Sequence, residues 1–99
     1  MSIPIPAINY EQIGFNIRDL RLEQNKTVVE VATDLGISVT DYRKIENGDV
    51  KVDVSDIVIL SAYFGVPADI IVRDCTVYLV EERLRETYAT ASQQNSSHS

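Results

Sequence analysis

The chain has 99 residues, enough for one domain around a single hydrophobic core. Its hydrophobic content of 44% and charged content of 24% exclude an intrinsically disordered chain. A total of 15 acidic side chains against 9 basic ones gives a net charge of -6, the opposite of the basic excess expected of an ordinary nucleic-acid-binding domain.

The cysteine content and the hydropathy pattern exclude several further classes. Cys75 has no partner for an internal disulfide, so we interpret it as a small, partly buried side chain. Residues 1–8 are apolar, but they lack a basic start and are interrupted by two prolines, unlike a secretion signal. No run approaches the ~20 apolar residues that span a bilayer. We therefore expect a soluble, cytoplasmic protein that holds no metal or cofactor.

The first helix is predicted to follow an extended N-terminal arm over residues 1–8. Asn9, with Gln12 three positions later, has the pattern of a capping box at the start of a helix over residues 10–24. Apolar residues at spacings of four and three predict its buried stripe. These residues are Ile13, Ile17 and Leu20.

A second, shorter helix is predicted over residues 28–35. Thr27 and Glu30 form another capping-box pattern at its start. Gly36 follows it and can take the positive φ that a sharp turn between helices needs. One face of this helix is apolar, and it comprises Val28, Val31, Ala32 and Leu35.

A third helix is predicted over residues 39–46, capped by Ser38 and ended by Gly48. Asp41 lies three positions after the cap, where a carboxylate suits the positive helix end. We interpret Tyr42 as a core residue whose hydroxyl reaches the surface. Two short helices joined by a tight turn form the pattern of a DNA-binding helix-turn-helix.

Two more helices are predicted after a loop. Asp53 caps a helix over residues 54–64, and Pro67 starts a short one over residues 68–72. We expect five residues of the longer helix to lie in the core. They are Val54, Ile57, Val58, Leu60 and Phe64.

The C-terminal part carries two competing patterns. Residues 75–80 have strand-like β-branched content, but Val77, Val80, Leu84 and Tyr88 recur at helical spacing. We favour a helix over residues 76–87. The sequence thus divides into four parts: an arm (1–8), a helix-turn-helix domain (9–74), a C-terminal helix (75–88) and a polar tail (89–99). The C-terminal helix is a candidate dimerisation element. We expect the tail to be disordered and His98 within it to be solvated.

The order and spacing of these landmarks resemble the phage repressor/Cro-type helix-turn-helix regulators, the XRE family, over residues 13–72. The matching residues are Ile17, Leu20-Arg21, Thr27, Val31-Ala32, Leu35-Gly36, Ser38, Ile45-Glu46-Asn47-Gly48 and Phe64-Gly65-Val66-Pro67. The resemblance implies an all-α fold: a compact five-helix repressor-like bundle containing the helix-turn-helix, to which we add the C-terminal helix.

The resemblance also implies which residues meet double-stranded DNA. The helix over residues 39–46 would be the recognition helix in the major groove, with Arg21 and Glu46 as the ion pair that positions it. The implied DNA contacts are Val28, Val39, Thr40, Arg43, Lys44, Asn47 and Lys51. Among these, Lys44 could donate to guanine O6 and N7, and Thr40 could donate or accept. Asn47 and Lys51 match positions that meet the DNA backbone.

Three positions leave alternatives open. Val28 stands where this family often has a Gln, and the valine side chain cannot make a hydrogen bond to DNA. Asp41 would repel phosphate, although we favour its role as the partner of the Ser38 cap. Arg18 is interpreted equally well as a phosphate contact and as part of a solvated helix face.

Two functions follow from these residues. The leading hypothesis is a sequence-specific transcriptional regulator that binds DNA as a homodimer on two half-sites. The alternative is an acidic protein-interaction module, such as an antitoxin-like partner, that keeps the fold with weak DNA binding. We expect no enzyme, because the sequence shows no catalytic carboxylate pair, activated nucleophile, phosphate loop or metal cluster.

Overall fold

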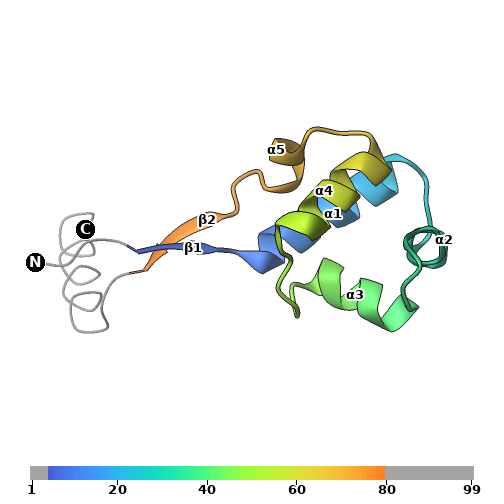
Figure 1. The fold of residues 1–99 in the computed structure, drawn as a ribbon, viewed down its shortest axis with the longest axis horizontal. Helices are drawn as coiled ribbons and strands as arrows, with labels where there is room; N and C mark the ends of the chain where they lie inside the picture. The colour runs from blue at the N-terminus through green and yellow to red at the C-terminus, as the bar shows by residue number, and fades with distance from the viewer. Residues whose placement is uncertain (1–4, 80–99) are drawn as a thin grey trace, which may run out of the picture. The chain divides into compact units, whose positions relative to one another are not determined.

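The computed structural model describes residues 5–79 of the chain. The chain forms two compact units. One is a helical unit, Asn9–Cys75, and the other contains two short strands. The helical unit contains α1 (Tyr10–Glu23), α2 (Val28–Leu35), α3 (Val39–Asn47), α4 (Val54–Phe64) and α5 (Ala68–Ile71) (Figure 1). The predicted starts of these helices agree with the structure, and the predicted ends differ by no more than one residue.

Side chains at the helix starts explain this agreement. Thr27 and Glu30 form the predicted capping box at α2, and Asp53 forms a capping box with Asp56 at α4. At α1 the predicted box is only half present. The Asn9 side chain accepts from the backbone N–H of Gln12, but the Gln12 side chain donates to Asn16 at 3.0 Å instead of returning to the cap.

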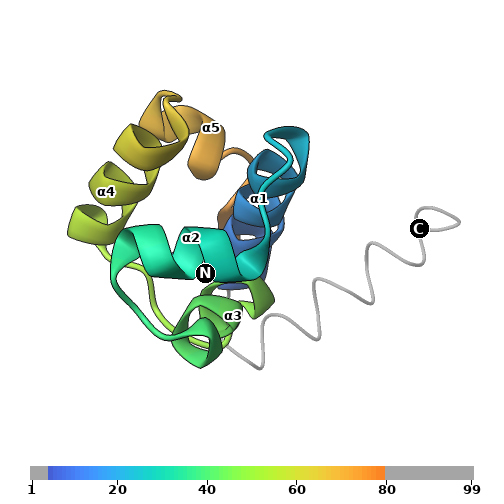
Figure 2. The same ribbon diagram turned by 90° about the vertical axis from the view of Figure 1, so that its right-hand side faces the viewer.

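The core of the helical unit draws residues from all five helices. Ile17, Val31, Tyr42 and Ile71 are its largest fully buried side chains. Figure 2 shows α1 and α4 on opposite sides of the unit, with α2 crossing between them and α3 lying below α2. Burying apolar side chains at this crossing supplies the main driving force that holds the helices together.

The predicted core face of α4 is partly wrong. Leu60 and Phe64 are buried, but Val54 is 79% and Val58 is 57% exposed. Because α4 is apolar almost all the way round, the spacing of its apolar residues does not distinguish the buried face from the exposed one. The structure therefore leaves an exposed apolar surface on α4.

α1 and α3 approach closely at Gly14. A Cβ atom at this position would lie 2.2 Å from the backbone oxygen of Glu46 and 2.6 Å from that of Ile45. Both obstacles are backbone atoms, so they cannot move aside as a flexible side chain could. Glycine at position 14 is what allows α3 to sit this close to α1.

Asn16 ties α1 to the end of the helical unit. It is 3% exposed, and its Nδ2 donates to the carbonyl oxygens of Ile71 and Arg73, both at 2.9 Å. The backbone N–H of Asn9 donates to the Cys75 carbonyl at 2.6 Å. Cys75 is buried, and burial raises the pKa of its thiol, as expected of a packed side chain.

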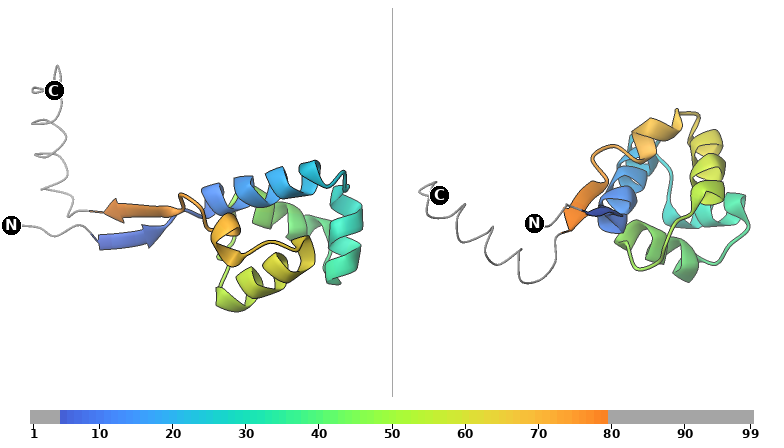
Figure 3. Two further views of the ribbon diagram at one scale, coloured as in Figure 1. Left: turned by 90° about the horizontal axis from the view of Figure 1, so that it is seen from above. Right: turned by 60° about the vertical axis from the view of Figure 1, so that its left-hand side comes forward.

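The predicted helix over residues 76–87 is wrong at its start. β1 (Ile5–Ile8) and β2 (Thr76–Leu79) form a two-stranded antiparallel sheet in which Ile5 lies opposite Leu79 (Figure 3). Thr, Val and Tyr in this segment favour a strand once a partner strand is available. That partner is the N-terminal arm, which lies far away in the sequence. Residues 80–87 of the predicted helix, the end of the candidate dimerisation element at 88 and the tail over 89–99 lie outside the described residues.

The two kinds of glycine in this fold predict different losses of stability from the same substitution. In an isolated helix, Gly14→Ala would stabilise by up to about 1 kcal/mol through helix propensity. Here we expect it to destabilise by about 2–3 kcal/mol, because the added methyl meets backbone. Gly36→Ala should cost only about 1–2 kcal/mol, the strain of a positive φ in open space. Urea unfolding measures both, and a stabilised Gly14→Ala variant would contradict the close approach.

Candidate nucleic-acid interface

The turn between α2 and α3 is short and tightly bonded. Gly36 has φ 74°, and the N–H of Ile37 donates to the carbonyl of Ala32 at 3.0 Å. Ser38 then caps α3 by accepting from the backbone N–H of Asp41. The left-handed glycine and the immediate new cap let the chain change direction within a few residues.

α3 presents a polar face to solvent. Thr40, Arg43 and Lys44 are exposed on it, together with Asn47 in its last turn, whereas Tyr42 and Glu46 are buried. Lys51 is also exposed, in the loop that leads to α4. The structure thus brings four of the seven predicted contact residues to one helix face and leaves Lys51 accessible beyond its end.

The two valines among the predicted contacts lie differently. Val28 and Val39 are both half-buried and pack against the hydrophobic core. Each can therefore offer only an apolar edge to a ligand.

The carboxylates near α3 differ in how they are engaged. Asp34 on α2 accepts a hydrogen bond from the Tyr63 hydroxyl of α4 at 2.6 Å. Burial and this bond raise the pKa of Tyr63 to about 12, so the hydroxyl stays protonated at neutral pH. Asp41 and Asp49 are exposed. Asp41 therefore remains the one carboxylate on α3 itself that faces solvent near the basic residues.

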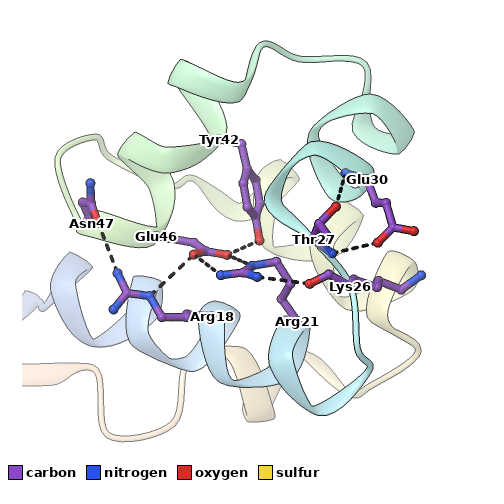
Figure 4. Close-up of polar contacts among 8 residues, drawn as sticks. All are labelled: Arg18, Arg21, Lys26, Thr27, Glu30, Tyr42, Glu46 and Asn47. Atoms are coloured by element: carbon purple, nitrogen blue, oxygen red, sulfur yellow. Dashed lines mark hydrogen bonds and ion pairs between the residues drawn. The ribbon is translucent and has the colours of Figure 1, made fainter.

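A buried carboxylate joins α3 to α1. Arg21 on α1 donates from Nε to Glu46 Oε2 at 2.7 Å and from a terminal nitrogen to Oε1 at 3.1 Å (Figure 4). The Glu46 side chain is only 5% exposed and that of Arg21 only 11%. This two-point contact fixes both the position and the orientation of α3.

Tyr42 belongs to the same network, which corrects the prediction that its hydroxyl reaches the surface. The residue is fully buried, and its hydroxyl donates to Glu46 Oε2. Burial and the carboxylate raise the pKa of Tyr42 far above its ordinary value. The sequence signal for this contact is the spacing of four, which places Tyr42 and Glu46 one turn apart on the same face of α3.

The charge of Glu46 is retained despite its burial. Burial alone would raise the pKa of this carboxyl, but the hydrogen bonds from Arg21 and Tyr42, with the charges of Arg21 and Arg18, hold it below the ordinary value. Glu46 is therefore ionised at neutral pH and keeps both partners in place.

Arg18 is not simply part of a solvated helix face. Its Nη2 donates to Asn47 Oδ1 at 3.2 Å, and its Nε lies 3.5 Å from Glu46 Oε1. Arg18 precedes Arg21 by one helical turn, so both side chains reach from α1 toward α3 (Figure 4). Sequence reasoning left its role open because the position of α3 beside it is a tertiary feature.

Within 5–79, no group of three or more His, Cys, Asp or Glu side chains could hold a metal ion. No helix in that range is long and apolar enough to cross a membrane.

These features define a class of protein domain: a small helical unit whose second and third helices form a helix-turn-helix, with the third held in place by an ion pair. A helix-turn-helix family model, HTH_3, matches residues 17–71, which is more than half of the chain. The chain therefore belongs to this helix-turn-helix family, which confirms the resemblance to the XRE regulators and the mainly helical fold.

Solved structures show the same fold. The DNA-binding domain of BldD has a TM-score of 0.60 at 23% identity, covering 65% of this chain and 93% of that one. The restriction-modification controller protein C.AhdI from Aeromonas hydrophila has a TM-score of 0.58 at 18% identity, covering 63% and 94%. A hypothetical transcription factor, NHTF, from Neisseria has a TM-score of 0.60 at 22% identity, covering 79% and 84%. No curated protein sequence matches the chain.

The buried carboxylate predicts a specific pH dependence. Because the folded-state pKa of Glu46 lies below its ordinary value of 4.5, its contribution to stability is present above that pH. It is lost as the pH falls through the folded-state value. Glu46→Gln should cost about 1–3 kcal/mol at pH 7. The difference from the unsubstituted protein should shrink below pH 4.5, as followed by urea unfolding at several pH values.

The matched control is Glu23→Gln, which removes an exposed carboxylate at the end of α1. It should leave stability nearly unchanged at every pH. If both variants respond alike, the network around Glu46 does not stabilise the fold.

Proposed function

We propose that this protein is a transcriptional regulator that binds a specific duplex sequence as a homodimer, with α3 in the major groove. The observation that carries the proposal is the exposed face of α3, on which Thr40, Arg43 and Lys44 stand out from a helix fixed by the Arg21–Glu46 ion pair. A rigidly held helix with outward donors is suited to reading base edges.

The side chains of this face suggest distinct roles. Lys44 would donate to guanine O6 or N7, and Thr40 would bond a base edge or a phosphate. Arg43, Asn47 and Lys51 would hold the DNA backbone on either side. Val39 and Val28 would offer apolar contact only, for which a thymine methyl is the natural partner.

Asp41 on α3 and Asp49 just after it are exposed carboxylates near this face, whereas two other neighbouring carboxylates are engaged in contacts. Asp34 of α2 is bonded to Tyr63 of α4, and Glu46 is neutralised by Arg21 inside the unit. At physiological salt, charges more than about 8 Å away are largely screened. The cations of α3 would therefore act on phosphates with little interference from distant carboxylates. A DNA-binding protein must be located in the same compartment as the DNA. We expect this compartment to be the cytoplasm.

The test is binding to duplex DNA over a range of salt concentrations, followed by selection of the bound sequences. Affinity should fall steeply as salt rises, because bound cations release counterions from the duplex. Lys44→Ala should cost about 1–3 kcal/mol on the selected sequence and relax the preference at one base pair. Lys51→Ala should weaken all sequences alike and reduce the salt dependence, since it would contact only phosphate.

Two results would count against this function. The absence of binding and of any enriched sequence, even at about 50 mM salt, would favour the protein-interaction module instead. An equal loss for Lys44→Ala on all sequences would remove base reading from that residue.

The homodimer is proposed from the need to span two half-sites and from the exposed surface of α4. The exposed residues of this helix carry no charge. They are Val54, Ser55, Val58, Ile59 and Ala62. Two copies with a net charge of -6 each repel one another, so an uncharged apolar surface suits contact with a second copy. The segment over 80–88 stays a predicted second contact outside the described residues.

Two aspartate substitutions separate this contact from a general effect of charge. Val58 is 57% exposed on α4 and Leu22 is 56% exposed on α1. Val58→Asp should shift the protein toward monomer and weaken binding to a two-half-site duplex, because it places a charge in the interface. Leu22→Asp adds the same charge elsewhere and should do neither. Sedimentation equilibrium measures the shift, and equal behaviour of the two variants would exclude α4 as the interface.

A further inference from the structure

The backbone of the two-stranded sheet alternates between groups that face the partner strand and groups that face outward. In the register of β1 and β2, Ile8 lies opposite Thr76. One residue further on, the Asn9 N–H donates to the Cys75 carbonyl at 2.6 Å. Hydrogen-bonded and non-hydrogen-bonded pairs alternate along an antiparallel ladder. Ile8 and Thr76 therefore form a non-hydrogen-bonded pair, and their backbone N–H and carbonyl groups point away from the partner strand.

The outer edges of β1 and β2 consequently carry different groups. The next non-hydrogen-bonded pair is Pro6 opposite Tyr78. On the β1 edge, Pro6 has no N–H to donate, so Ile8 alone supplies an outward donor within this strand. On the β2 edge, Thr76 and Tyr78 each present an N–H and a carbonyl. Because proline prevents regular strand pairing, only β2 offers a complete edge to another strand.

The β2 edge lacks the features that usually prevent strand addition. Proteins protect exposed edges with charged residues and prolines, and β2 has the sequence TVYL, which contains neither. Within residues 5–79, the only strand that pairs with β2 is β1 (Figure 3). A two-stranded sheet is only marginally stable alone, whereas further strands stabilise it. An additional strand on β2 would therefore use its outward backbone groups and stabilise the sheet.

We propose that β2 pairs with β2 of a second copy of this chain, antiparallel about a two-fold axis, so that the two copies share one four-stranded sheet. The N–H of Thr76 in each copy then meets the carbonyl of Tyr78 in the other, and the N–H of Tyr78 meets the carbonyl of Thr76. The same strand supplies both halves of the contact, as a two-fold interface requires. The β1 strands lie outermost, and their prolines end the sheet, so that a closed dimer forms instead of a fibre.

The charge distribution suits a second copy as the occupant of this edge. Two copies with a net charge of -6 each repel one another, but neither β1 nor β2 contains a charged residue. Pairing through β2 therefore brings no carboxylates of the strands together. The inference rests on the proposed homodimer and adds to it a contact that α4 does not make. It also gives part of the candidate dimerisation element, 75–88, a strand contact in place of the predicted helical one.

The first measurement is an NMR experiment on a mixture of isotope-labelled and unlabelled full-length chains, which detects contacts between copies only. The N–H protons of Thr76 and Tyr78 should show contacts to protons of the unlabelled copy, whereas the Ile8 N–H on the opposite edge should show none. Contacts of the β2 edge to the same chain alone would mean that another segment of this chain covers it. That result overturns the proposal, and so does a dimer without any contact between copies at this edge.

The second measurement compares dimer affinity among the unsubstituted protein, Tyr78→Pro, Ile8→Pro and Tyr78→Val by sedimentation equilibrium. Tyr78→Pro removes an outward N–H from β2, and Pro6 opposite it shows that the sheet accepts proline in this pair. It should weaken dimerisation about tenfold or more, because the two-fold axis removes two hydrogen bonds at once. Ile8→Pro removes an outward N–H from the β1 edge, and Tyr78→Val keeps the N–H of β2. Both controls should stay within about twofold.

The outcomes separate failure of this contact from failure of the proposed function. Equal affinities of Tyr78→Pro and Ile8→Pro overturn the β2 contact. If Val58→Asp gives monomers while Tyr78→Pro remains dimeric, the β2 contact fails and the proposed homodimer through α4 stands. The reverse result supports β2 and removes α4. A protein that is monomeric at every concentration overturns both contacts, and its DNA binding is then judged by the salt titration alone.

Circular dichroism checks that the helical unit of each variant is folded. If Tyr78→Pro does not fold, the contacts between labelled and unlabelled copies decide the question, because that measurement needs no substitution.

Discussion

The contact between α1 and α3 is the constraint on which the rest of this structure depends. Gly14 lets the two backbones approach until a single added carbon would collide with the carbonyl of Glu46. Beside this crossing, the Glu46 carboxylate is buried and bonded by Arg21 and Tyr42. A buried charge costs several kcal/mol unless it is paired, so the network tolerates few other positions of α3. Steric fit and charge pairing therefore select the same arrangement.

The outward surface of α3 follows from this inward attachment. With Tyr42 and Glu46 facing α1, the helical repeat turns Thr40, Arg43 and Lys44 toward solvent. The same attachment brings Arg18 to Asn47 and forms a pocket between the first three helices. The proposed base reading thus depends on the buried attachment of α3 to α1. That attachment also explains how an acidic chain can present a locally cationic surface.

Local signals made much of this fold predictable. The caps Thr27, Ser38 and Asp53 and the glycine after α2 each act within a few residues of chain, so helix starts and ends could be placed from neighbouring residues alone. The core face of α4 could not be placed in this way. Its apolar residues surround the helix, and only the packing of α4 against the rest of the unit left Val54 and Val58 outside.

By itself, the sequence determined the five helices, the turn at Gly36 and membership in the helix-turn-helix family, because these depend on short-range spacing. Only the tertiary structure decided the strand at 76–79, the close approach at Gly14, the inward hydroxyl of Tyr42 and the engagement of Arg18. The strand partners and the residues at the Gly14 and Arg18 contacts are distant in sequence. The Tyr42 hydroxyl turns inward because α3 packs on α1. Contacts of this kind depend on how the helices pack in three dimensions. The local spacing of residues along the sequence does not show which distant residues will meet.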